Sequence, residues 1–422
     1  MLRHLLKSTL AKNAGWMLVG QLSTYGLKVL YFIVIARLLG VVDYGIVVGA
    51  FALVMLVAQY SRLGMGTVLM RYVSGSHSRF ATYWGNILMV TIVASGILIL
   101  LLRLAAYHIL DPASAGIVLA TAVGSVLCEQ LTTSATQAFQ AHQSMRMAST
   151  LGQLIPMFRT FTAIGMLLVL HHTTAKVWTV ASMIASLGAA VVALIAVTVK
   201  LGWPRFSPHL VLKHVGEGVE YSFAASTVNA YNDLDKTMLS HYGMSAANGI
   251  YGLAYRIVDV GSVPLAAIQL AAEPRLFQLA ESGSDATIRL GRRLLRHGVL
   301  VSAAAALGMF IIAPLIPLLT GKGYGDAISA LRWLCIIPIF RSVHQITGTV
   351  LTSLGLQRYR TVTQVAAVVL NFGLNVWLIP ECGWHGAAWS SLATDGALGI
   401  MNWCVLERHT KLHAMKMAES VV

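Results

Sequence analysis

Long apolar stretches alternate along the chain with short polar clusters. The first apolar stretch covers 14–38 and the second covers 44–63, and a tight polar turn at 39–45 separates them. A helix over the first stretch would be about 37 Å long at roughly 1.5 Å per residue, which is enough to cross a bilayer. The opening of the chain therefore predicts two consecutive membrane-crossing helices.

The same pattern recurs to the end of the chain. Lipid offers no hydrogen-bond partners to a backbone, so each apolar stretch must be a helix. We therefore expect an all-α polytopic membrane protein. Its twelve transmembrane helices are predicted at 14–38, 44–63, 83–104, 114–138, 149–170, 177–199, 218–239, 249–271, 297–319, 327–353, 361–379 and 386–406.

Composition supports this prediction. The chain has 422 residues, of which 57% are hydrophobic and only 11% charged, whereas soluble domains have about 25% charged residues. The formal net charge is +14, which in a soluble protein would suggest nucleic acid as a partner. Basic residues collect in the cytoplasmic loops of membrane proteins, so we expect no nucleic acid here.

The distribution of basic residues predicts the orientation of the chain. With the N-terminus inside, the inner segments hold twenty basic residues and the outer segments five. Both termini are therefore predicted to be cytoplasmic. Three basic residues before the first apolar stretch imitate a signal peptide, but that stretch is too long and a second follows at once, so we expect a retained helix. The five outer residues are Arg37, Arg103, Lys176, Lys236 and Lys322.

The chain shows signs of an internal duplication. A long, Pro-containing loop at 200–217 separates six predicted helices from six others, so we expect an N-terminal lobe (1–199), a cytoplasmic linker (200–217) and a C-terminal lobe with a short tail (218–422). The turn with Gly40 and Gly45 after the first helix is similar to 242–251 after the seventh, and glycine suits tight turns. Because each half has an even helix count, parallel repeats are predicted.

Several short motifs, in order, resemble one family of membrane carriers. They are Asn13 with Trp16, Ala36-Arg37-Leu38-Leu39-Gly40, Asp43-Tyr44-Gly45, Arg71-Tyr72-Val73-Ser74, Leu234-Asp235-Lys236, Gly249-Ile250-Tyr251, Ala254-Tyr255-Arg256 and Gly386-Ala387-Ala388. The ordered set resembles the polysaccharide transporter, or oligosaccharide flippase, family of Wzx-type carriers. That family lies within the multidrug/oligosaccharidyl-lipid/polysaccharide superfamily, and the resemblance spans nearly the whole chain.

This resemblance implies a fold and a function. The fold would be two pseudo-symmetric six-helix lobes around a central cavity. The function would be to flip undecaprenyl-diphosphate-linked oligosaccharides, such as O-antigen, capsule or exopolysaccharide units, across the bacterial cytoplasmic membrane by alternating access. Expected partners are the lipid-linked oligosaccharide diphosphate, the bilayer and other membrane proteins of polysaccharide assembly. We expect no enzymatic activity, no cofactor and no metal.

Five basic residues lie inside predicted membrane helices, which is unusual without any family argument. Each costs about 2.5–3.5 kcal/mol at the centre of a bilayer on insertion scales. A visiting diphosphate would explain them, since guanidinium groups match phosphate oxygens. Alternatives remain: Arg256 can pair with Asp259 three residues later, and Arg332 can reach the interface. The candidate substrate-binding residues are Lys28, Arg159, Arg256, Arg332 and Arg341.

Three acidic residues in predicted membrane helices are candidates for coupling transport to protons or sodium: Glu129, Asp259 and Asp395. The alternative for Glu129 and Asp395 is a salt bridge to one of the five basic residues. Asp235 and Lys236 are interpreted as a structural pair at the end of a helix.

Two rival functions follow from the same pattern. A multidrug or cation antiporter of the same superfamily would need an acidic cavity, and five intramembrane cations against three acids argue otherwise. A membrane glycan polymerase or ligase would need sizeable external loops, whereas the predicted outer loops are short. The chain has no GxxxxGK[ST] motif, so ATP is not expected to be the direct energy source.

Overall fold

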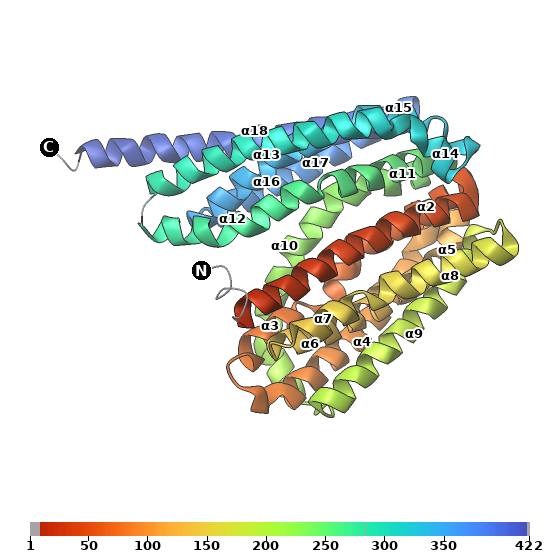
Figure 1. The fold of residues 1–422 in the computed structure, drawn as a ribbon, viewed down its shortest axis with the longest axis horizontal. Coiled ribbons are helices and arrows are strands. Elements are labelled where there is room, and N and C mark those ends of the chain that lie inside the picture. Colours follow the sequence, from red (N-terminus) through yellow and green to blue (C-terminus); the bar gives the residue numbers. More distant parts are fainter. Residues whose placement is uncertain (1–8, 283, 420–422) are drawn as a thin grey trace. The chain divides into compact units, whose positions relative to one another are not determined.

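The computed structural model describes residues 9–282 and 284–419, and every regular element in that part of the chain is helical (Figure 1). This confirms the predicted all-α membrane fold. The chain divides into two compact units. Unit 1 comprises Met1–Asp233 and Ser240–Gly249, and unit 2 comprises Leu234–Leu239 and Ile250–Val422.

Unit 1 is built around its first long helix, α2, which packs against α5, α7 and α8. A π-helical turn, Val123–Cys128, joins α5 to α6. The helices of this unit are α2 (Thr9–Ala58), α3 (Met65–Val73), α4 (Phe80–Ile109), α5 (Pro112–Ala122), α6 (Glu129–Ala141), α7 (Met145–Gly152), α8 (Leu154–Leu170), α9 (Ala175–Leu201) and most of α10 (Pro208–His241).

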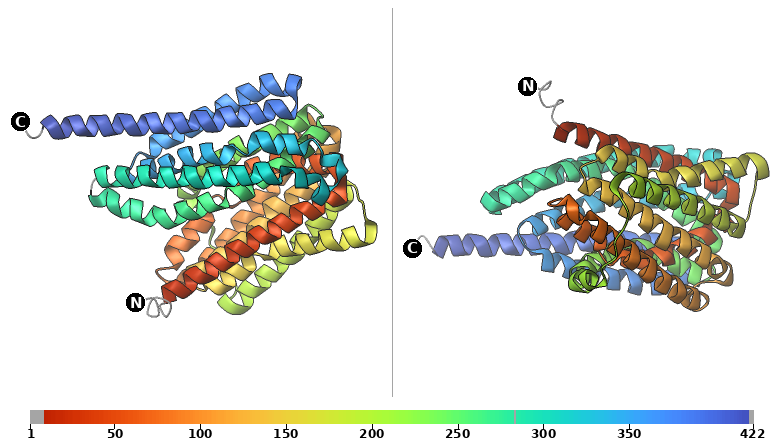
Figure 2. Two further views of the ribbon diagram at one scale, coloured as in Figure 1. Left: turned by 45° about the horizontal axis from the view of Figure 1, so that its top comes forward. Right: turned by 90° about the horizontal axis from the view of Figure 1, so that it is seen from below.

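Unit 2 is held by α16, which packs against α13 and α18, and by the pair of α17 with α18. The long α18 is the blue helix that ends near the C-terminus in Figure 2. Its helices are most of α11 (Ser245–Gly261), then α12 (Val263–Ser282), α13 (Ser284–Ile312), α14 (Ile316–Thr320), α15 (Ala327–Leu334), α16 (Ile337–Ser353), α17 (Gln357–Cys382) and α18 (Trp384–Glu419).

Each of the twelve predicted spans is mostly helical. Eight stretches of the described chain are long and apolar enough to cross a membrane, or nine if the bent pair α11 and α12 forms one span. The first, Ser23–Val73, contains two predicted spans. The predicted spans 218–239 and 386–406 lie in α10 and α18, which are helical but less apolar and fall outside this set. The structure is thus consistent with twelve spans.

The glycines of the two similar turns have the backbone conformation expected of tight turns. Gly40 interrupts α2 with φ of 70°, and Gly243 after α10 also has φ of 70°. This left-handed region is open to glycine at little cost. Gly45 and Gly249, the next glycines of these turns, pack against each other in unit 1. A Cβ on Gly45 would lie 1.8 Å from the carbonyl oxygen of Ser245, so the two helices approach to backbone contact.

Candidate functional site

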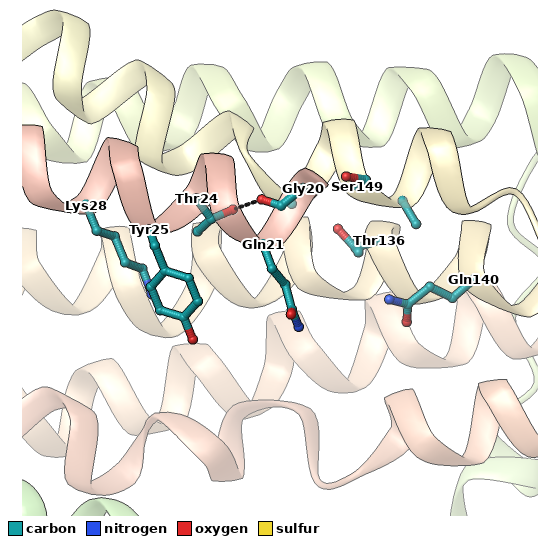
Figure 3. Close-up of a pocket in the computed structure, with 10 residues that line it drawn as sticks. Gly20, Gln21, Thr24, Tyr25, Lys28, Thr136, Gln140 and Ser149 are labelled. Carbon is teal, nitrogen blue, oxygen red and sulfur yellow. Dashed lines mark hydrogen bonds between the residues drawn. The ribbon is translucent and has the colours of Figure 1, made fainter. Parts of the chain in front are cut away.

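Lys28 lines a polar pocket in unit 1, named here the Lys28 pocket (Figure 3). Its volume is about 210 Å³. None of its ten described lining residues carries a carboxylate, and most carry a hydroxyl, an amide or an aromatic ring. They are Gly20, Gln21, Thr24, Tyr25 and Lys28 of α2, Thr136 and Gln140 of α6, and Ala148, Ser149 and Gly152 of α7.

The pocket follows from the spacing of polar residues in α2. Gln21, Thr24, Tyr25 and Lys28 are spaced i, i+3, i+4 and i+7, so they share one face of the helix. Gly20 lets α7 approach that face, since a Cβ there would lie 1.9 Å from the Ser149 hydroxyl oxygen. The Lys28 side chain is exposed, and its Nζ lies 5.8 Å from the centre of the Tyr25 ring.

Arg159 of α8 is not among the residues that line the Lys28 pocket. Its side chain contacts α9 and α6. Its Nε donates to the Ser186 hydroxyl at 2.8 Å, and its Nη1 lies 3.4 Å from a carboxylate oxygen of Glu129. Glu129 directly follows the π-helical turn, where Gly124 leaves room for the guanidinium: a Cβ there would lie 3.3 Å from Nη2. Arg159 and Glu129 therefore neutralise each other, which was the predicted alternative for Glu129.

Unit 2 holds a buried set of charged and hydroxyl groups, named here the C-unit network. Its centre is Asp235 of α10, whose side chain is fully buried. This carboxylate accepts hydrogen bonds from the Tyr251 hydroxyl and from the Ser391 hydroxyl, the latter at 3.0 Å, and lies 3.2 Å from Lys236 Nζ. The members are Asp235, Lys236, Tyr251, Tyr255, Asp259, Arg341 and Ser391.

Tyr255 links the two halves of the C-unit network. Lys236 Nζ lies 4.0 Å from the centre of its ring, a cation–π contact. Its hydroxyl accepts a hydrogen bond from Arg341 Nη2 at 2.9 Å. The other end of the Arg341 guanidinium donates from Nη1 to Asp259 at 3.0 Å. Helices α10, α11, α16 and α18 all contribute to this network, which accounts for Asp235 and Lys236 of α10 and for Ser391 of α18.

Asp235 and Lys236 do pair, as predicted, with 3.2 Å between the carboxylate and Nζ, but their predicted position at the end of a helix was wrong. Neither ends a helix, since α10 continues to His241, and Lys236 is buried rather than part of an outer segment. Burial is tolerated because hydroxyls from α11 and α18 satisfy the carboxylate and two tyrosine rings cover the ammonium. A usable signal was present in the sequence: Tyr251 and Tyr255 are four residues apart and so share one face of α11.

The structure also shows the contacts of the other candidate residues of unit 2. Arg256 lies 3.8 Å from Asp259, which confirms the local ion pair expected from their spacing. Arg332 is exposed, with its guanidinium 4.9 Å from the centre of the Phe310 ring. Asp395 is buried, and a carboxylate oxygen lies 3.3 Å from His344 Nε2. Its partner is therefore this histidine, one turn after Arg341 on α16.

The five candidate cations are thus divided between the units. Lys28 and Arg159 belong to unit 1, and Arg256, Arg332 and Arg341 belong to unit 2. Arg159, Arg256 and Arg341 each lie near a carboxylate. Among the side chains that the structure describes, no carboxylate pairs with Lys28. A single cavity shared by all five remains a prediction.

Comparison with known proteins gives one family and one fold. The family described as "Polysaccharide biosynthesis protein" matches residues 10–280. A comparison with curated protein sequences finds no significant match. Solved structures match over nearly the whole chain. An inward-facing multidrug resistance MATE family transporter of the MOP superfamily has a TM-score of 0.75 at 14% identity, covering 94% of this chain and 99% of that one.

Two further structures agree. An outward-facing MATE family transporter has a TM-score of 0.62 at 13% identity and covers 98% of both chains. The MATE multidrug transporter DinF-BH has a TM-score of 0.62 at 16% identity and covers 96% of both chains. At these identities the likeness establishes the fold alone.

Proposed function

Because the chain belongs to the polysaccharide biosynthesis protein family and is a multi-pass membrane protein with the fold of MATE family transporters, we propose that it is a transporter that flips undecaprenyl-diphosphate-linked oligosaccharides. The movement is from the inner to the outer leaflet of the bacterial cytoplasmic membrane, by alternating access. The excess of basic residues in the loops predicted to be inside supports cytoplasmic termini. Other membrane proteins of polysaccharide assembly would supply the substrate and take it up.

The Lys28 pocket is the observation that carries this proposal. Lys28 is a cation in a membrane-crossing helix, and none of the described residues that line the pocket around it is acidic. A cation at such a position is costly unless water or an anion solvates it. The diphosphate of a lipid-linked sugar supplies that anion, and a cationic drug would be repelled.

The arginines give the proposal a second element. Asp259 lies within ion-pair distance of both Arg256 and Arg341, so two positive groups share one carboxylate. Arg341 has a side-chain exposure of only 9%, against 38% for Arg256. In this proposal Arg256 is the group that meets phosphate, and Arg341 holds Asp259 in place. Arg159 meets phosphate by exchanging its contact with Glu129 for one with the substrate.

Asp395 and Glu129 remain the candidates for ion coupling, together with Asp259. The pair of Asp395 and His344 is buried, with 5% and 4% of their side chains exposed. A carboxylate next to an imidazole can exchange a proton as its surroundings change. Proton uptake at this pair would couple to the movement of the substrate.

A multidrug antiporter is the second candidate, because solved structures of this fold include multidrug resistance transporters and because unit 2 buries Asp235 and Asp395. The two functions need opposite charge in the binding site. Lys28→Gln should impair the flipping of an anionic lipid. The same change should leave cation export unchanged or improve it.

The test is leaflet-resolved accumulation of lipid-linked sugar in cells whose own copy of the protein is deleted. Lys28→Gln should reduce the outer-leaflet pool at least tenfold at an equal protein level. The matched control is Lys176→Gln, which changes an exposed lysine at the start of α9 in the same unit. Normal flipping by Lys28→Gln would refute the site, and export of organic cations without any flipping would favour the antiporter.

A further inference from the structure

We infer that the Lys28 pocket is a subsite for a sugar ring, so that it selects the saccharide of the lipid-linked substrate. This inference rests on the proposed function and adds to it the part of the substrate that the pocket takes. Some of the hydrogen-bonding groups of the pocket are already used by the protein itself.

Three aliphatic hydroxyl groups of the pocket donate to the protein's own backbone. Thr24 donates to the Gly20 carbonyl at 2.8 Å, Thr136 to the Thr132 carbonyl at 3.1 Å and Ser149 to the Trp16 carbonyl at 3.1 Å. A hydroxyl has one donor and two acceptor sites, so each of these oxygens still accepts hydrogen bonds. The pocket therefore presents fixed acceptors.

The two amides complete the set. Among the side chains that the structure describes, no hydrogen bond engages the amides of Gln21 and Gln140, and each amide both donates and accepts. They come from α2 and α6, and Figure 3 shows them extending from separate helices into the same region. Lys28 adds three donors at a distance of two turns along α2. A ligand that fits must donate and accept at several neighbouring points and carry a negative group at one end.

A sugar ring beside a negatively charged group meets this description. Its hydroxyls each donate and accept, and its C–H face can lie on the Tyr25 ring. The volume of about 210 Å³ equals roughly seven waters at about 30 Å³ each. That is room for one sugar residue rather than for a whole oligosaccharide. An acyl chain would leave the amides unpaired, and an organic cation would meet Lys28 with no acid to compensate.

The two sources of the negative group are the diphosphate and an acidic substituent on the sugar. Either would lie at Lys28 while the amides contact hydroxyls. Experiments can distinguish the two kinds of contact. The amides then contribute only to binding of the sugar, whereas Lys28 contributes to binding of the negative group.

The test uses the full-length protein purified in detergent and two probes. One is the lipid-linked saccharide extracted from cells of the source organism in which the protein is deleted, and the other is undecaprenyl diphosphate without sugar. The variant is Gln21→Leu/Gln140→Leu, which keeps side-chain size. If the variant loses two hydrogen bonds to the sugar, at about 0.5–1.5 kcal/mol each, the preference for the sugar-bearing lipid should fall by about 5- to 150-fold. The affinity for undecaprenyl diphosphate should stay unchanged, and the control Gln364→Leu in α17 should keep the full preference.

Three other outcomes of this binding experiment would count against the sugar subsite. An unchanged preference in the double variant overturns the sugar subsite but leaves the proposed function standing. An equal loss for both lipids means that the pocket holds diphosphate only. Failure of the wild-type protein to bind either lipid overturns the proposed function and the subsite together.

A second measurement covers the case in which the double variant does not fold. Position 21 is exposed, so Gln21→Cys in a Cys404→Ser background should react readily with a maleimide. The extracted lipid-linked saccharide should slow this reaction at least fivefold, and undecaprenyl diphosphate should slow it much less. Equal reaction rates with and without the saccharide would contradict the subsite.

Discussion

Asp259→Asn tests how unit 2 tolerates charge in a membrane helix. The change keeps the size of the side chain but removes the charge that faces Arg341, whose Nη1 lies 3.0 Å away. The guanidinium, with a side-chain exposure of 9%, then keeps the neutral Tyr255 hydroxyl as an acceptor. Breaking a buried ion pair by removing one partner costs about 3–5 kcal/mol. Asp259 is 40% exposed, so water already screens the pair and the lower end applies, about 3 kcal/mol.

Removing the cation instead should cost less. In Arg341→Met the buried guanidinium itself is removed, and Asp259 keeps Arg256 at 3.8 Å and access to water. The loss is then two hydrogen bonds, partly offset by the desolvation of the guanidinium that is no longer needed, or about 1–2 kcal/mol. The double variant Asp259→Asn/Arg341→Met should therefore be more stable than Asp259→Asn alone.

The measurement is the apparent melting temperature of the purified protein in detergent, followed by intrinsic fluorescence. At about 2–4 °C per kcal/mol for a domain of 150–250 residues, Asp259→Asn should melt about 6–12 °C below the wild-type protein. Arg341→Met should melt at an intermediate temperature. Glu381→Gln, an exposed acid near the end of α17, is the control and should change little. A double variant that melts at or below Asp259→Asn would refute the reasoning from an uncompensated buried charge.

Three further predictions use close contacts. Gly45→Ala should destabilise unit 1 by about 1–3 kcal/mol, because its Cβ would lie 1.8 Å from the Ser245 carbonyl oxygen. The control Gly26→Ala meets nothing within 4 Å and should be neutral or slightly stabilising. Melting curves of the two variants check this prediction. Gly124→Val should displace the Arg159 guanidinium from Glu129 and lower flipping in the cell assay, and Gly116→Val, which has open space, should not; equal activities would contradict this. Tyr251→Phe should cost about 1–3 kcal/mol, because buried Asp235 loses a donor, and an unchanged melting temperature would show that Ser391 and Lys236 suffice.

The sequence predicted what depends on neighbours along the chain. Apolar stretches of membrane-crossing length gave the helices, because lipid leaves the backbone no alternative. Gly40 and Gly243 were expected in tight turns, and both have positive φ. The pair of Arg256 and Asp259 followed from a spacing of three residues on one helix.

What the sequence did not predict depends on how helices far apart in the chain are rotated about their axes. Arg341 pairs with Asp259 from 82 residues away, and Ser391 reaches Asp235 from 156 residues away. Whether such groups face each other is decided by packing of apolar neighbours and not by their own spacing. For the same reason the histidine partner of Asp395 was not predicted, although His344 is only three residues after Arg341 in sequence.

The polar face of α2 has a consequence for the synthesis of the protein. Gln21, Thr24 and Lys28 make the first membrane helix a poor match to lipid when it leaves the ribosome. The residues of α6 and α7 that line the Lys28 pocket together with this face are made on the order of a hundred residues later. At about 5–20 residues per second, that is a delay of roughly 5–20 s. During this interval α2 must stay in the insertion machinery or near the headgroups, so its release into the bilayer depends on the arrival of α6 and α7.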